Sequence, residues 1–181
     1  MRGLGLGLGA ALALVAGLSL PSRADPGALA AATADFYYAY QSLPRGGIPS
    51  ADRLPRLKPH VTPALYALLA EALAAETRHT EATKGTEPPL VEGDPFTSLF
   101  EGASAFEVGG CTEEGAAGRC AVDLTYKDGS GKTAWQDTAL LAKTAEGWRI
   151  DNIAYGGTWD FGNKGRLTDL LRSVAAETPQ P

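Results

Sequence analysis

Helical spacing of apolar side chains begins just after the first 25 residues. Leu29, Phe36 and Tyr40 lie at positions i, i+7 and i+11, which places them on one face of a helix. The preceding Asp25-Pro26 pair is typical of a helix start, because Asp caps free amide groups and Pro is tolerated in the first turn. The pattern predicts an amphipathic helix with an aromatic face that ends before the sequence PRGG.

Two further helices are predicted from the same kind of pattern. Residues 64–82 are rich in Ala, Leu and Glu, which are strong helix formers, and they follow a second capping pair, Thr62-Pro63. Residues 167–174 place three leucines and a valine at i, i+3, i+4 and i+7, which defines a short amphipathic helix near the C-terminus. The segments between the first helix and residue 100 that are rich in proline and glycine are expected to be loops.

Beyond residue 100 the apolar period changes to two, the spacing of a half-buried strand. Four segments show it, each bounded by turn-forming residues: 105–111, 119–126, 133–143 and 148–155. Because short turns join neighbouring segments, they predict an antiparallel meander of about four strands. With helices before the strands and one short helix after them, the fold class is predicted as α+β, a sheet packed on N-terminal helices.

The last predicted strand breaks the strict alternation of faces. By parity, Trp148 and Ile150 share one face, whereas Ile153 and Tyr155 share the other. A β-bulge at residues 151–152 would bring both pairs to one face and bend the strand. We therefore predict that Trp148 and Ile150 face the helices.

The first 24 residues are typical of a secretory signal peptide. Arg2 precedes an apolar run over residues 4–20, and Ser22 and Ala24 place small side chains where signal peptidase requires them. We predict cleavage between Ala24 and Asp25. A permanent membrane anchor is the alternative, but glycines interrupt the run, and it is marginal against the roughly 20 residues of a spanning helix. The predicted location is the periplasm or the medium, with no stable membrane anchor after cleavage.

Cleavage would leave a single domain at residues 25–176 and a disordered tail at 177–181. Removal of the signal peptide takes away two of the 16 basic residues and none of the 21 acidic ones, so the net charge falls from −5 to −7. An acidic chain without a basic run is repelled by phosphate backbones and anionic lipid headgroups. We therefore expect no nucleic-acid or membrane partner, which leaves a small ligand or a protein.

Cys111 and Cys120 are separated by eight residues. In an exported protein an even number of cysteines favours a disulfide bond, which would clip the base of a long hairpin. A metal site is the alternative, but it needs two further ligands, and the intervening residues offer only Glu113 and Glu114. We predict the disulfide.

Four pieces of the sequence together resemble a known family. FYYAY in the first helix, VTPALYALL in the second, the GDPF loop and the closing GWRIDNIAY are similar to the bacterial domain of unknown function 3828. This exported family belongs to the cystatin-like, nuclear transport factor 2-like superfamily, and the resemblance covers residues 29–172. It implies a curved antiparallel sheet around a long helix, with a cone-shaped cavity between them. It implies no activity, since that fold hosts isomerases, dehydratases and non-catalytic binding domains.

Several catalytic and metal-binding motifs are incomplete in this chain. DGSGKT at residues 128–133 is similar to a phosphate-binding loop, but Tyr126 stands where the first glycine is required, and a strand follows instead of a helix. His60 and His79 have no second histidine or HExxH pattern beside them. No GxSxG motif occurs, and neither cysteine has a nearby base. No metal, cofactor or hydrolase nucleophile is predicted.

In the cone that the resemblance implies, aromatic and acidic side chains would line two walls and bind a ligand. Tyr37 and Tyr40 come from the first helix. Trp135 and Asp137 share a face of their strand, and Tyr155 lies on the last strand. A buried Asp137 beside Tyr40 would suit proton abstraction next to a carbonyl, with the tyrosine as oxyanion donor. The alternative is that the aromatics are core residues and that Asp137 faces solvent or accepts backbone hydrogen bonds.

Asp94, in the GDPF loop, also has two interpretations. At the mouth of the cone it would bind a polar group of a ligand. Alternatively it caps a turn, as Asp before Pro commonly does, while Phe96 fills the core.

Three functions are compatible with these patterns. The predicted one is an exported non-catalytic module that binds a small ligand in the cone or a protein on the sheet. The first alternative is a small-molecule isomerase or lyase that uses an Asp/Tyr pair. The second is an exported inhibitor or immunity-type protein that neutralises an envelope-acting toxin or enzyme.

Overall fold

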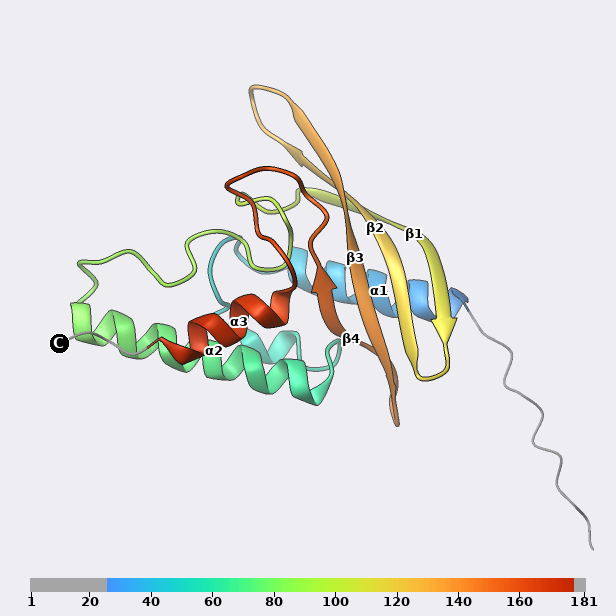
Figure 1. Ribbon diagram of the computed structural model, residues 1–181, viewed down its shortest axis with the longest axis horizontal. Coiled ribbons are helices and arrows are strands. Elements are labelled where there is room, and N and C mark those ends of the chain that lie inside the picture. The colour runs from blue at the N-terminus through green and yellow to red at the C-terminus, as the bar shows by residue number, and fades with distance from the viewer. Residues whose placement is uncertain (1–25, 178–181) are drawn as a thin grey trace, which may run out of the picture.

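The computed structural model describes residues 26–177. The predicted signal peptide with its cleavage site, and residues 178–181 of the predicted tail, lie outside this range. Two helices, four strands and a third helix follow one another, with the short 3-10 helix η1 (Leu54–Arg56) between the first two helices (Figure 1). The predicted α+β class is confirmed. Within residues 26–177 no helix is long and apolar enough to cross a membrane.

The three α-helices occupy the segments that the apolar spacing predicted. They are α1 (Pro26–Gln41), α2 (Pro63–Thr83) and α3 (Leu167–Ala176). Thr62 caps α2, because its hydroxyl oxygen accepts a hydrogen bond from the Leu65 amide at 3.2 Å. The helix ends at Lys84, which adopts the left-handed conformation with φ 53°.

One antiparallel sheet holds all the strands of the described residues, in the order β1-β2-β3-β4. The strands are β1 (Ala105–Glu114), β2 (Ala117–Lys127), β3 (Lys132–Thr144) and β4 (Gly147–Ala154). Figure 1 shows α1 crossing one face of this curved sheet, while α2 and α3 lie together beside β4. The helices that precede the sheet in sequence therefore cover one face and one edge of it.

The space between α1 and the sheet is filled by side chains. Leu29, Phe36 and Tyr37 of α1 are fully buried there, against Val122 and Leu124 of β2, which are also fully buried. Most of the aromatic face predicted for the first helix is therefore part of the hydrophobic core, which is the main source of stability for a domain of this size.

The predicted bulge is present in β4. Leu140 pairs with Asn152 and Leu141 pairs with Ile150, so Asp151 is the extra residue. Trp148 and Ile150 are buried before the bulge and Ile153 after it. The bulge thus brings the apolar side chains before and after it to one face of β4, although strict alternation would place them on opposite faces.

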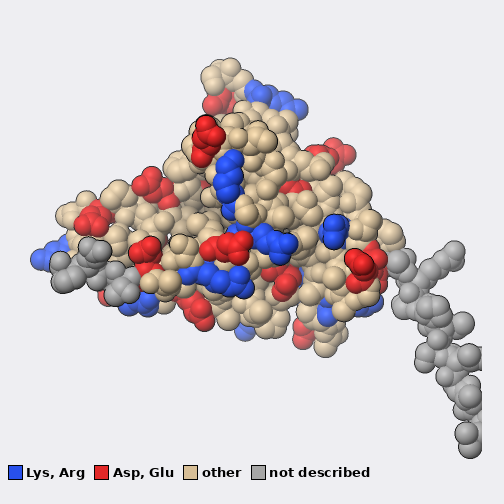
Figure 2. Space-filling model, in the orientation of Figure 1, with Lys and Arg blue, Asp and Glu red and all other residues tan. Residues whose placement is uncertain are grey.

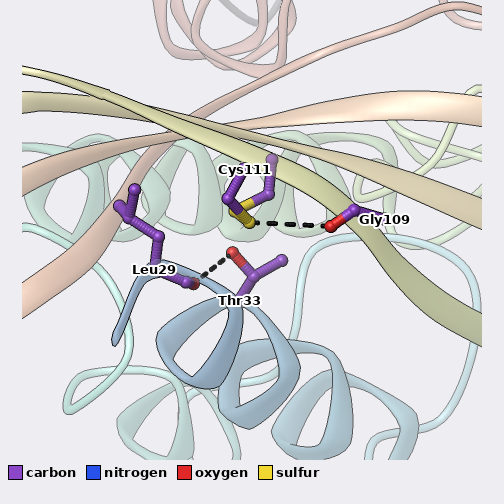
Figure 3. The surroundings of a disulfide bond; sticks show 5 residues. Leu29, Thr33, Gly109 and Cys111 are labelled. Atoms are coloured by element: carbon purple, nitrogen blue, oxygen red, sulfur yellow. Dashed lines mark hydrogen bonds between the residues drawn. A yellow bond between two sulfur atoms is a disulfide. The ribbon is translucent and has the colours of Figure 1, made fainter. Parts of the chain in front are cut away.

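Cys111 and Cys120 form the predicted disulfide, with an S–S distance of 2.03 Å. They lie opposite one another on β1 and β2, over the first turns of α1, where Leu29 and Thr33 point toward them (Figure 3). The expected position at the base of the hairpin was wrong. Both strands continue past the cysteines to a turn at residues 115–116, so the bond lies nearer the turn.

Candidate functional site

The six predicted ligand-binding residues come from four different segments. Tyr37 and Tyr40 lie on α1, Asp94 lies in the loop over residues 91–104, and Trp135 and Asp137 lie on β3. The sixth, Tyr155, follows β4 directly. The structure joins four of the six into two separate hydrogen-bonded pairs.

The first pair is Tyr40 and Asp94. The Tyr40 hydroxyl donates to Asp94 Oδ2 at 2.7 Å, and the Phe96 amide donates to Asp94 Oδ1 at 2.8 Å. Asp94 is only 1% exposed, and this burial raises its pKa to about 6 even though both donors favour the charged form. Burial beside the Asp94 charge also raises the pKa of Tyr40. The carboxylate of Asp94 therefore caps a turn, which is the second of the two interpretations given for it.

Close packing around this pair explains a glycine nearby. Gly102 has φ +76°, and a Cβ atom built on it would lie 2.5 Å from Asp94 Oδ2 and 2.9 Å from the Tyr40 hydroxyl. Only a residue without a side chain fits at this place. The Ala103 amide then donates to the Tyr40 hydroxyl at 3.3 Å, so that this hydroxyl both donates and accepts a hydrogen bond.

The second pair is Trp135 and Asp137. Asp137 is 1% exposed and accepts four hydrogen bonds. Trp135 Nε1 donates at 3.1 Å, the Gly156 amide at 2.9 Å and the Ser98 amide at 2.8 Å, and the Ser98 hydroxyl makes a further short bond. These donors belong to β3 itself, to the segment after β4 and to the 91–104 loop. Asp137 therefore ties two loops to the sheet.

Ser98 and Asn163 complete this network, and sequence reasoning missed both. The Ser98 hydroxyl accepts from the Gly157 amide at 2.9 Å, while the Asn163 side-chain amide donates to the carbonyl oxygens of Asp94 and Thr97, each at 2.7 Å. The partners of Asn163 are 66 and 69 positions away in the chain. Neither apolar periodicity nor a local motif carries information about pairs so distant.

Tyr37 and Tyr155 do not bond to either carboxylate. The Tyr155 hydroxyl donates to the Pro95 carbonyl oxygen at 2.5 Å. The Tyr37 hydroxyl is buried and has no hydrogen-bond partner among the described residues. Burial, together with the charges of Asp137 and Asp94, raises the pKa of Tyr37. The catalytic combination considered from the sequence, Asp137 with Tyr40, is not joined, because Tyr40 donates to Asp94 instead.

Beside this network, and sharing Trp135 with it, three aromatic side chains form a surface feature that we call the aromatic ridge, made of Trp135, Trp159 and Phe161. The rings of Trp135 and Trp159 meet edge to face at 5.6 Å, and Trp159 stacks on Phe161 at 6.4 Å. Phe161 is 66% exposed. An exposed aromatic group of this kind commonly marks a binding surface.

Two hollows flank Trp159. One, of about 330 Å³, lies between the turn that joins β2 to β3 and the ring of Phe161. The other, of about 770 Å³, lies between residues 132–138 of β3 and residues 156–159, and we call it the slot. The molecular face in Figure 2 mixes acidic and basic side chains without a large area of one sign. Within residues 26–177 no group of three or more His, Cys, Asp or Glu side chains is placed to hold a metal ion.

Comparisons with known proteins do not assign this chain to a family. No family model matches it, and no curated protein matches it. Among solved structures, it is similar to the solution structure of a SEC-C motif-containing protein from Rhodopseudomonas palustris, at 11% identity and a TM-score of 0.34. That similarity covers 66% of this chain and 70% of the other. The resemblance to the domain of unknown function 3828 stays a prediction.

Proposed function

We propose that this chain is an exported, non-catalytic module that binds a small ligand or a protein partner. The observation that carries the proposal is how Asp137 is used. Its carboxylate accepts four hydrogen bonds from groups that hold two loops on the sheet. A substrate proton would have to displace the Ser98 amide or hydroxyl and leave that donor buried without a partner, at a cost of about 1–3 kcal/mol.

The surface beside this network supports a binding role. Trp135 of the aromatic ridge lies on β3, and Trp159 and Phe161 lie in a segment that hydrogen bonds to Asp137, Ser98 and the 91–104 loop hold in place. A rigid aromatic surface loses little conformational entropy on binding. The disulfide is compatible with folding in an oxidising compartment, which supports export to the periplasm or the medium.

The alternative, an isomerase or lyase, is favoured by one observation at the other carboxylate. Asp94 has a pKa raised to about 6 and a tyrosine hydroxyl at 2.7 Å, which are properties of a general base beside an oxyanion donor. A hollow of about 340 Å³ reaches Tyr40 and is also lined by Arg45 and Ser104. In this version the Asp/Tyr pair is Asp94 with Tyr40.

Deuterium exchange into small molecules tests both functions. The full chain is incubated in D₂O with a panel of small ketones and keto acids, and the recovered compounds are analysed by mass spectrometry. A non-catalytic module leaves carbon-bound hydrogen at the level of the buffer control. The proposal would be contradicted, and the alternative established, if deuterium uptake depended on the protein. In that case Tyr40→Phe should abolish the uptake and Tyr38→Phe should retain it. Tyr38 is a suitable control because it lies on the same helix and is 66% exposed.

A further inference from the structure

Only half of β3 has a neighbour on each side. Every residue of β2 pairs with β3, which is paired in this way from Lys132 to Ala142. β4 pairs with β3 only from Thr138, opposite Ala154. The chain then turns away, since the Tyr155 amide donates to the Gly165 carbonyl oxygen at 3.0 Å. Residues 132–135 therefore form an open strand edge along one wall of the slot.

The direction of the backbone groups on this edge follows from Gln136. Its carbonyl oxygen points away from β2 and is covered by Gly156, because a Cβ atom built on Gly156 would lie 2.1 Å from it. In an antiparallel sheet the amide and carbonyl of one residue point to the same side, and the side alternates along the strand. The amides and carbonyls of Lys132 and Ala134 therefore also point away from β2, into the slot. These are the groups that a further strand would bond.

The other edges of the sheet are protected, which makes this one unusual. On β4, Ile150 is bridged by Val61, with the Thr62 amide donating to the Ile150 carbonyl at 2.8 Å, and Ala154 is bridged by Arg166. Proteins commonly protect edges with such cover or with bulges and charges.

The outer edge of β1 uses the second kind of protection. Its register shifts between Val108 and Cys111, and Glu107 and Glu114 place charges along it. The open part of β3 has no bulge or proline, and its one charged residue is Lys132. Among the described strands, this edge is left available for pairing.

The shape and charge of the slot indicate what fits there. Gly157, Thr158 and Trp159 line the slot opposite β3, and one extended segment needs less room there than the edge of a second folded sheet. Lys132 carries the one formal charge among the residues that line the slot. The Lys164 ammonium group lies close by, donating to the Gly157 carbonyl oxygen at 3.3 Å. Two cationic groups favour an acidic segment.

We propose that an extended, acidic polypeptide segment of a partner protein binds in the slot by adding a strand to β3 at residues 132–135. The segment exchanges backbone hydrogen bonds with Lys132 and Ala134. It places an apolar side chain against Trp159 and an acidic one near Lys132. This inference rests on the proposed function, because it names the partner of a non-catalytic module.

A peptide display experiment on the full chain tests the inference. A library of random nine-residue peptides is selected for binding, and the enriched peptides are synthesised for affinity measurements. Ala134→Pro removes the one amide at the centre of the edge, and proline is tolerated on strand edges. Ala134→Ser keeps that amide and is the matched control. We expect acidic peptides with an apolar residue, at least tenfold weaker binding to Ala134→Pro, and unchanged binding to Ala134→Ser.

A second variant and a second measurement keep the test decisive if Ala134→Pro does not fold. Lys132→Glu should weaken binding of the acidic peptides at least tenfold at low salt. In amide hydrogen exchange, Lys132 and Ala134 should exchange fast in the free protein and become protected when a selected peptide is bound. Their protection in the free protein would overturn the inference.

Three other results would also overturn it. Peptides that bind all three variants equally would show that binding does not involve strand addition, although the binding function would remain. If no peptide were enriched, the slot would not be a site of strand addition. A dimer in sedimentation analysis that Ala134→Pro abolishes would identify a second copy of this chain as the occupant. Failure of the proposed function is distinguishable, because it appears as deuterium uptake and not in these measurements.

Discussion

Three tyrosines of α1 provide a direct comparison of hydroxyl groups in different surroundings. Tyr37→Phe, Tyr38→Phe and Tyr40→Phe each remove one oxygen atom from the same helix and leave the ring in place. The Tyr37 hydroxyl is buried without a hydrogen-bond partner among the described residues. The Tyr40 hydroxyl donates to Asp94 at 2.7 Å and accepts from Ala103 at 3.3 Å. Tyr38 is 66% exposed.

The expected changes in unfolding free energy differ in sign. An unsatisfied buried polar group costs about 1–3 kcal/mol, so Tyr37→Phe should stabilise the protein by about 1 kcal/mol. A hydrogen bond to a charged group contributes about 1.5–3 kcal/mol, so Tyr40→Phe should destabilise it by about 2–3 kcal/mol. Tyr38→Phe should change stability by less than about 0.5 kcal/mol.

Urea denaturation at pH 7 measures all three variants, with unchanged m-values showing that the comparison is valid. The reasoning would be refuted if Tyr37→Phe destabilised the protein as much as Tyr40→Phe. That result would mean that the Tyr37 hydroxyl has a partner, such as a bound water molecule, and that the two hydroxyls are equivalent.

Three further predictions concern pH, the closing strand and the disulfide. The pKa of Asp94 is raised from 3.8 to about 6 in the folded state, so the folded protein binds this proton more tightly. The difference in unfolding free energy between wild type and Asp94→Asn should therefore favour wild type most below pH 4 and fall by about 3 kcal/mol between pH 4 and 6. A difference that does not change with pH would contradict this prediction. Trp148→Ala should lower the free energy of unfolding by about 3–5 kcal/mol, because the Trp148 side chain is only 6% exposed. Arg149 is half-buried, and Arg149→Ala should change the free energy of unfolding very little. If Arg149→Ala were the more damaging change, the assignment of these two side chains to opposite faces of β4 would be wrong. Reduction of Cys111–Cys120 should lower the free energy of unfolding by about 2–3 kcal/mol, as expected for a loop of nine positions, and an unchanged urea midpoint with dithiothreitol would contradict it.

The bulge in β4 could be predicted because it is encoded in local parity. Trp148 and Ile150 conflict with Ile153 in the alternation of faces, and one extra residue is the smallest correction. The helices were predictable for the same reason, since a buried face repeats at fixed spacing. The ends of β1 and β2 were not. Residues 112–118 are polar and rich in glycine, and their pairing comes from the hairpin and not from an apolar pattern.

The candidate site was predictable only as a set of residue types. Asp94 and Asp137 stood out as acids next to aromatic segments, and both are buried in hydrogen-bonded networks. Their partners could not be predicted. Tyr40 lies 54 positions from Asp94, and Ser98 lies 39 positions from Asp137. Which tyrosine meets which carboxylate depends on how the 91–104 loop closes over the sheet, and this is a tertiary property that single-sequence patterns do not contain.

The central claim is that Asp137 is a structural acceptor inside a binding module and not an available base. Native-state hydrogen exchange of the Ser98 and Gly156 amides, both bonded to its carboxylate, tests it most directly. If the claim is correct, both amides exchange only with the free energy of global unfolding, like the amides in the centre of β3. Exchange of both amides through a local opening of about 1–2 kcal/mol, while β3 stays protected, would show that the carboxylate is accessible and would contradict the account.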